Sequence, residues 1–237
     1  MLPSLPIILI LVVLAAARRT EDVESVFREG GHEFRIIPAY AGQARYLDEV
    51  DPDPGAGAAS IWRERVVVAS REDCLAGYYE SSAKGRLSEP IRDLVRLEDA
   101  VDDLRGSTAS RIVDAALRKS ARRLRPQHRG LCFVEGEKMA ASAHEEAAGV
   151  SGFTAGSGRI LLLLNSEGTR REWTPYITAH EYHHASRAHK RPEEHPEGEP
   201  VTDLADYLIF EGRADSFARL LYPDKVPPWT RANPGGG

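Results

Sequence analysis

The residues best suited to chemistry form one short run, His180-Glu181-Tyr182-His183-His184. On a helix, residues four apart share a face, so His180 and His184 can both bind one metal ion. Glu181 lies on the adjoining part of that face, where its carboxylate can take a proton from a water held by the metal. The alternative interpretation is a His-rich surface helix without metal, because five of the eight histidines fall within residues 180–195.

The run has the H-E-x-x-H spacing that is typical of zinc peptidases. It requires a helix, and Thr174 as N-cap with Pro175 at the first helical position predicts one. We expect this helix to continue to Lys190, since Pro192 would then stop it.

A catalytic zinc site usually has three protein ligands and one open position. A metzincin would place Gly and His three and six residues after the second ligand, but Arg187 and Lys190 stand there, which excludes that class. The best acidic candidate is Glu211, with 26 residues between it and His184. This spacing fits the short-spacer aminopeptidase arrangement poorly, but it fits a Glu-ligand zincin with a longer connection.

Glu211 belongs to a second predicted helix, residues 203–221, with Thr202 as its cap. One stripe of this helix is apolar apart from two carboxylates and consists of Leu204, Leu208, Glu211, Asp215 and Ala218. Burying an unpaired carboxylate is costly, so we expect Glu211 to bind the metal and Asp215 to accept the outer N–H of a ligand histidine. Gly212 would let the two helices approach closely. The alternative is that both carboxylates are solvated at the edge of the stripe.

The run at 180–184, the acidic, proline-rich connection after it and residues 206–217 (Asp-Tyr-Leu-Ile-Phe-Glu-Gly-Arg-Ala-Asp-Ser-Phe) together resemble the YjaZ-type family of predicted bacterial Zn-dependent proteases. The resemblance covers residues 130–222. The Glu-x-x-x-Asp element also resembles the second half of the thermolysin-type signature, but Phe210 stands where thermolysin relatives carry Asn. What the resemblance implies is a gluzincin-like peptidase fold and no known substrate.

Two strands are predicted in the C-terminal half. The apolar run 159–165 follows turn residues at 152–158 and is predicted to be a strand. It could be an edge strand beside the metal or a central strand of the sheet. Residues 131–135 are predicted to form a neighbouring strand. Residues 20–125 read as mainly helical, with an antiparallel helix pair over 94–104 and 113–124. We therefore expect an α+β, zincin-like fold, mainly helical, with a small sheet beside the helix that carries His180.

Length and composition predict one domain. The 237 residues are 42% hydrophobic and carry a net charge of −5, so we expect a single metallopeptidase domain over 19–225, its metal site within 159–222, and a flexible tail at 226–237. No nucleic-acid partner is expected, because the one basic cluster reads as a solvated helix face: Arg118, Lys119, Arg122, Arg123 and Arg125. Cys74 and Cys132 read as free thiols.

Residues 1–18 form an apolar N-terminal segment. Its end, Ala15-Ala16-Ala17, resembles a signal-peptide cleavage site, but no Lys or Arg precedes it and Arg18-Arg19 follow. A signal, a membrane anchor, a mis-assigned start and a helix packed on the core all stay open. The charge order favours a cytoplasmic catalytic domain, with membrane association through residues 2–17 and secretion as the alternatives.

These observations predict one Zn²⁺ per chain held by His180, His184 and Glu211, with Glu181 as general base in the hydrolysis of a peptide or protein substrate. The competing hypothesis is a regulatory or scaffold protein that binds zinc without catalysis. His183 reads as a second-shell donor or as a packed polar residue. Candidates to stabilise the oxyanion are Tyr176, Tyr182, Tyr207 and His183. The sequence specifies neither the oligomeric state nor endo- versus exopeptidase action.

Overall fold

The structure is a computed structural model that describes residues 25–38, 40–50, 57–68, 90–106, 109–125, 130–137, 150–154, 159–164, 170–187 and 203–226. Several predictions fall outside these residues: the segment 1–18, the thiol of Cys74, the cap Thr202, the helical extension to Lys190, and the tail from 227 onwards. The side chain of Cys132 is also not described. A single domain over 19–225 stays a prediction.

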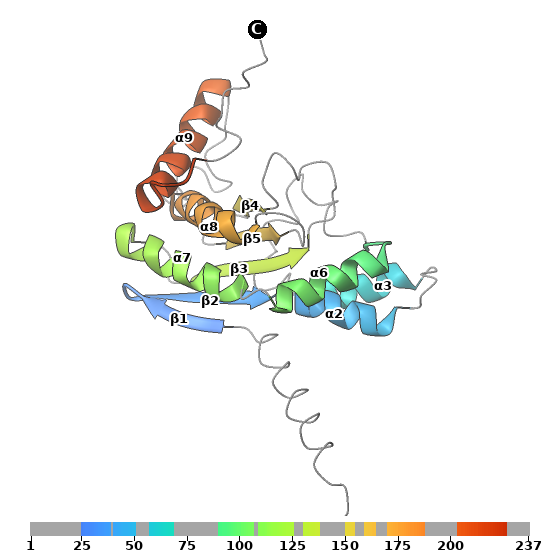
Figure 1. Cartoon of the computed structure of the whole chain (residues 1–237). Helices are drawn as coiled ribbons and strands as arrows, with labels where there is room; N and C mark the ends of the chain where they lie inside the picture. The colour runs from blue at the N-terminus through green and yellow to red at the C-terminus, as the bar shows by residue number, and fades with distance from the viewer. Residues whose placement is uncertain are drawn as a thin grey trace, which may run out of the picture.

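A five-stranded mixed sheet lies at the centre of the described chain (Figure 1). Its strands follow the order β1 (Ser25–Glu29), β2 (His32–Pro38), β3 (Gly130–Glu137), β5 (Arg159–Leu164) and β4 (Val150–Thr154). Neighbours β2, β3 and β5 run parallel, whereas the edge strands β1 and β4 are antiparallel to their partners. With the helices described below, the sheet confirms the expected α+β fold class.

The two predicted strands are present as β3 and β5. β5 is central, and its described side chains are all buried, which suits a continuous apolar run covered on both faces: Ile160, Leu161, Leu162 and Leu164. The edge position beside the helix that carries His180 belongs to β4. Assigning residues 152–154 to a turn was therefore wrong, since they pair with β5.

Residues 25–38 form a β-hairpin, so the prediction of a mainly helical segment from residue 20 is wrong here. Gly30 and Gly31 connect its strands with φ values of 60° and 85°. A two-residue hairpin turn of the primed type requires positive φ, which glycine adopts without strain. Phe27 and Phe34 stack across the two strands, with ring centroids 4.7 Å apart.

The helices form two groups (Figure 1). The first group consists of α2 (Tyr40–Glu49), α3 (Ala58–Trp62), η2 (Arg63–Val68) and α6 (Leu94–Gly106). The second group consists of α7 (Ala109–Arg123), α8 (Arg170–Arg187) and α9 (Leu204–Leu221), and α8 packs on β4 and β5. The predicted helices over 94–104 and 113–124 are present as α6 and α7, but α6 packs on α2 and α7 packs on α8 instead of on each other. In the described part of the chain, no helix is both long and apolar enough to span a membrane.

The starts of α8 and α9 differ from the sequence prediction. α8 begins at Arg170, four residues before Thr174, so Pro175 lies inside the helix, and Glu172 places a negative charge in the first turn, where the helix dipole favours it. α9 is capped by Asp203, whose carboxylate accepts a hydrogen bond from the Asp206 N–H at 2.9 Å. A carboxylate in this position satisfies one of the free N–H groups of the first turn.

Side chains from neighbouring helices cap two helix C-termini. The Tyr182 hydroxyl of α8 donates to the Leu124 carbonyl at the end of α7, at 2.6 Å. Lys119 of α7 donates to the Leu221 carbonyl at the end of α9, also at 2.6 Å. Such contacts satisfy carbonyl groups that have no partner within their own helix. α7 therefore connects α8 with the end of α9.

The predicted solvated face of α7 is in part a packing face. Arg118 forms a salt bridge with Asp114 at 2.6 Å, and its guanidinium lies 4.0 Å from the centre of the Phe27 ring. Arg122 donates to Glu29 at 3.2 Å. Together with Lys119, these contacts attach α7 to the β-hairpin and to α9.

Replacing Tyr182 with Phe tests the cap on α7. The substitution leaves the part-buried Leu124 carbonyl without this donor, so we expect the free energy of unfolding to fall by about 1 kcal/mol. The half-exposed Tyr207 provides a matched control, for which Tyr207→Phe should change it by less than about 0.5 kcal/mol. Urea unfolding measures both, and equal effects of the two substitutions would contradict the cap.

Candidate metal centre

The His-Glu-x-x-His run lies on a buried part of α8. Only 4% of the His184 surface and 7% of the Glu181 surface are exposed, and His183 is also buried. α8 contacts α7, α9, β4 and β5, so it is enclosed on several sides. The alternative interpretation of a His-rich surface helix is therefore wrong.

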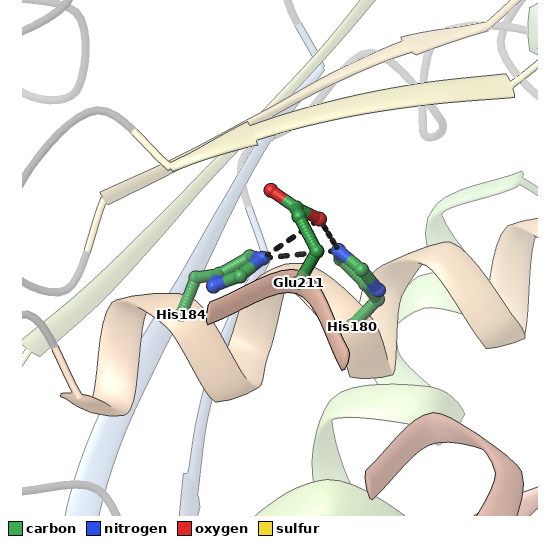
Figure 2. Close-up of side chains that lie close together, drawn as sticks. All are labelled: His180, His184 and Glu211. Atoms are coloured by element: carbon green, nitrogen blue, oxygen red, sulfur yellow. Dashed lines mark hydrogen bonds and ion pairs between the residues drawn. The ribbon is translucent and has the colours of Figure 1, made fainter. Parts of the chain in front are cut away.

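Two histidines of α8 and one glutamate of α9 point toward one another (Figure 2). His180 Nε2 lies 3.0 Å from His184 Nε2 and 3.0 Å from Glu211 Oε2. His184 Nε2 lies 3.6 Å from the same oxygen of Glu211. These three side chains form a group that could hold a metal ion, and all their donor atoms lie within 4.8 Å of one another.

The separations between the donor atoms can be compared with those of a tetrahedral zinc site. Bonds of about 2.0–2.1 Å at tetrahedral angles place two donor atoms about 3.3 Å apart. The separations here are 3.0, 3.0 and 3.6 Å, so their mean is close to that value. Two nitrogens and one carboxylate oxygen are also ligands that zinc prefers. The three residues therefore fit a zinc ion that keeps one open position.

Asp215 lies behind His180, on the side away from the group. Its Oδ1 is 3.4 Å from His180 Nδ1, an ion-pair distance without the alignment of a hydrogen bond. The same Oδ1 accepts a hydrogen bond from the Tyr176 hydroxyl at 3.1 Å. A carboxylate in this position favours the tautomer that leaves Nε2 free to bind a metal. Asp215 therefore lies beside the outer nitrogen of His180, and a hydrogen bond from that N–H to Asp215 stays a prediction.

Opposite charges in the group shift the pKa values of its members. Burial lowers the pKa of His180, but the nearby carboxylates of Asp215 and Glu211 favour the protonated ring, outweigh this effect and raise the pKa to about 9. Burial raises the pKa of Glu211, but hydrogen bonding to His180 and His184 outweighs that effect and lowers it to about 2. Without metal, His180 and Glu211 therefore form an ion pair near neutral pH.

Glu181 lies outside this group and faces the edge strand. Its Oε2 accepts a hydrogen bond from the Thr154 hydroxyl of β4 at 2.9 Å. Burial raises the pKa of the Glu181 carboxyl, and it outweighs the positive charges of His180 and His184 and the Thr154 hydrogen bond, which lower it. A buried carboxylate with a raised pKa beside a metal group has the properties of a general base.

Three of the four oxyanion candidates have other contacts. The Tyr176 hydroxyl donates to Asp215 and the Tyr182 hydroxyl donates to Leu124, so both are committed within the fold. His183 is buried against the Phe217 ring, with centroids 5.6 Å apart, which agrees with a packed polar residue. Tyr207 is half-exposed and lies one turn before Glu211 on α9. Of the four candidates, Tyr207 is the one whose side chain a substrate could reach.

Two expectations about α9 are wrong. Its predicted apolar stripe is buried only at its C-terminal end, because Leu204 and Leu208 are 72% and 61% exposed. A Cβ atom added at Gly212 would meet no other atom within 4 Å, so this glycine is not required for close helix packing. The Glu211 side chain is 35% exposed and contacts both histidines, so it is not simply solvated.

Sequence reasoning missed Gly152 and Thr154 of β4, and it missed that the Tyr176 hydroxyl donates to Asp215. A Cβ at Gly152 would lie 2.2 Å from Glu181 Cγ, closer than any real contact. A glycine inside a strand often marks such a close approach, and this signal was present in the sequence. The Tyr176 contact has a weaker signal, since it joins residues 39 positions apart.

Elemental analysis tests the ligand set directly. The purified protein should contain about one zinc per chain, as three ligands and one open position imply. Glu211→Ala and His184→Ala should each remove it after dialysis against a weak chelator. Glu98→Ala, which changes an exposed glutamate of α6, should keep it. Zinc retained in both ligand variants would contradict the group in Figure 2.

The ion pair predicts opposite pH effects with and without metal. The folded pKa of His180 is about 9 against an ordinary 6.5, so without metal its stabilisation is fully present below pH 6.5 and is lost as the pH rises through 9. The folded pKa of Glu211 is about 2 against 4.5, so its stabilisation is present above pH 4.5 and is lost as the pH falls through 2. Zinc binds neutral imidazole, so its affinity should rise with pH.

Thermal unfolding measures this difference. Between pH 6.5 and 9, we expect the Tm of the metal-free chain to fall relative to that of the zinc-loaded chain, so the gap between the two widens. The His180→Ala variant is the control and should show no such widening. Parallel Tm curves for the two forms of the parent would contradict the ion pair.

Comparison with known proteins connects this site with a family. Residues 110–234, more than half of the chain, match the family described as "Predicted Zn-dependent protease (DUF2268)". The "Uncharacterized protein YjfC" of Bacillus subtilis (strain 168) is 27% identical over 154 residues, which cover 59% of this chain and 47% of that relative. The chain thus spans about half the length of this curated relative. No solved structure matches the chain. The family resemblance expected from the sequence is confirmed, and the chain belongs to the predicted Zn-dependent protease family.

Proposed function

We propose that this protein is a zincin-like peptidase, in which His180, His184 and Glu211 hold one zinc ion and Glu181 is the general base. When bound, zinc would polarise a peptide carbonyl and lower the pKa of a water molecule. The fit of the three donor atoms to tetrahedral separations supports the ligand set. The family description supports proteolysis as the activity.

The position of Glu181 is the observation that carries the proposal. The residue follows the ligand His180 in sequence, yet its carboxylate is outside the metal group and is held by Thr154. A purely structural zinc site has no need of a buried carboxylate beside its ligands, and burying one is unfavourable. In hydrolysis, Glu181 would accept a proton from the attacking water and deliver it to the amine that leaves.

The edge strand supports a peptide as the substrate. β4 lies at the end of the described sheet and packs against α8, so its outer edge runs beside the helix that carries the site. An extended peptide can add to such an edge through main-chain hydrogen bonds. This arrangement would place a peptide bond next to Glu181 and the three ligands.

Replacing Glu181 with Gln distinguishes a peptidase from a zinc-binding scaffold. The zinc content should stay at about one per chain, because Glu181 is not a ligand, while hydrolysis of a peptide library should fall about 10²–10⁴-fold with the loss of the base. Glu172→Gln on the same helix is the control, since Glu172 is exposed, and should keep both properties.

Two outcomes would contradict the peptidase. The first is a zinc-loaded parent that cleaves no peptide in the library or in denatured casein. The second is a Glu181→Gln variant that cleaves as fast as the parent, since the activity would then come from a contaminant or from another site.

A further inference from the structure

Two residues of β4 lie on the same face of the strand, opposite Glu181. Residues two apart in a strand point to one side, and Gly152 and Thr154 both contact Glu181 of α8. α8 also packs on the sheet through apolar side chains, with Ile177 and Leu162 in the same core. The contact with Glu181 is therefore a polar connection within a mainly apolar layer.

Because Gly152 has no side chain, the Glu181 carboxylate can lie directly beside it. A Cβ atom at this position would be 2.2 Å from Glu181 Cγ, 2.7 Å from Cδ and 2.8 Å from Oε1. Each separation is shorter than real Cβ atoms show, so any side chain at 152 would displace the Glu181 carboxylate or the strand. Glycine weakens a strand interior, so its presence here is explained by this close approach.

Thr154 fixes the orientation of the same residue. Its hydroxyl lies 2.9 Å from Glu181 Oε2 and 3.2 Å from the Glu181 carbonyl oxygen. A hydrogen bond to a charged carboxylate is shorter and stronger than one between neutral groups. Because a single hydroxyl contacts both the side chain and the backbone of Glu181, it restricts the rotation of the carboxylate relative to α8.

We propose that Gly152 and Thr154 form a seat on β4 that positions the Glu181 carboxylate, with Thr154 as a positioning residue. The catalytic consequence rests on the proposed function, whereas the seat itself does not. The strand proposed to pair with the peptide would then also orient the base. A peptide aligned on β4 would be in register with Glu181 without any movement of α8 relative to the sheet.

The first test uses the zinc-loaded full chain and a peptide that the parent cleaves. Thr154→Val keeps the shape and removes the hydroxyl, and we expect kcat to fall about tenfold, because a misplaced base is less effective, with KM and zinc content unchanged. Thr154→Ser restores the hydroxyl and should stay within about twofold of the parent. Equal kcat values for Thr154→Val and Thr154→Ser would overturn the positioning role.

Thr178→Val is the matched control. Thr178 is buried in α8, and its hydroxyl donates to the Thr174 carbonyl of the same helix at 2.7 Å. The Thr178→Val substitution therefore removes a buried threonine hydroxyl that makes no hydrogen bond to Glu181. A tenfold loss of kcat in this control as well would show that any such deletion disturbs α8, and would overturn the specific role of Thr154.

The second test needs no activity. A double-mutant cycle measures unfolding of the parent, Thr154→Val, Glu181→Ala and the combined variant in urea. Thr154→Val should change the unfolding equilibrium constant about tenfold in the parent and by only about threefold in the Glu181→Ala background, where the 3.2 Å contact with the main-chain carbonyl of residue 181 remains. Equal changes in both backgrounds would overturn the seat.

The two tests separate failure of the seat from failure of the proposed function. A parent that cleaves no peptide contradicts the peptidase, while the unfolding cycle still decides whether Thr154 holds Glu181. Gly152→Ala adds an independent check, because the collision with Glu181 Cγ should lower stability in the parent and do so much less in the Glu181→Ala background. Equal destabilisation in both backgrounds would contradict the close approach.

Discussion

The ion pair between His180 of α8 and the carboxylates of α9 is the interaction on which the site depends. The side chains of the first two turns of α9 are exposed, and its apolar contacts with the core come mainly from its C-terminal half, at Ala214, Phe217, Ala218 and Leu221. Polar contacts add to this attachment, from Glu211 and Asp215 to His180 and from Lys119 to the C-terminal end of α9. Because a metal at this group would join the same two helices, metal binding and docking of α9 are coupled.

α8 distributes its polar groups over different neighbours. Successive residues on a helix point about 100° apart, so His180, Glu181 and Tyr182 face three different elements. His180 meets α9, Glu181 meets β4, and Tyr182 reaches the end of α7. A helix with polar residues on several sides is stable in a core only when each of them has a partner. The same contacts that stabilise the buried helix thus hold His180 and Glu181 at fixed positions.

Local rules were sufficient to find the three residues that could hold a metal ion, but not the elements that support them. The spacing of His180 and His184 follows from helix geometry, and Glu211 was identified as an acidic residue in an apolar pattern. The same pattern predicted the face of α9 correctly near Ala218 but not near Leu204, because periodicity shows which residues share a face and not what covers it. The hairpin at Gly30-Gly31 was missed although two glycines between β-prone runs are a turn signal. β4 was missed because Gly152 reads as a turn residue until the carboxylate that it accommodates is known.

The two histidines of the group have unlike surroundings, and this difference follows from α9. His180 has the Asp215 carboxylate behind its outer nitrogen, an arrangement that raises the basicity of the ring. His184 instead stacks on Phe210, with ring centroids 4.0 Å apart, and its Nδ1 has no hydrogen-bond partner in the described part of the chain. Phe210 is the position at which the sequence departs from the thermolysin-type signature, and the structure gives that departure a physical role in orienting His184. One imidazole is thus held by charge and the other by packing, so the electrostatic support of the site comes from the Glu211–Asp215 turn of α9.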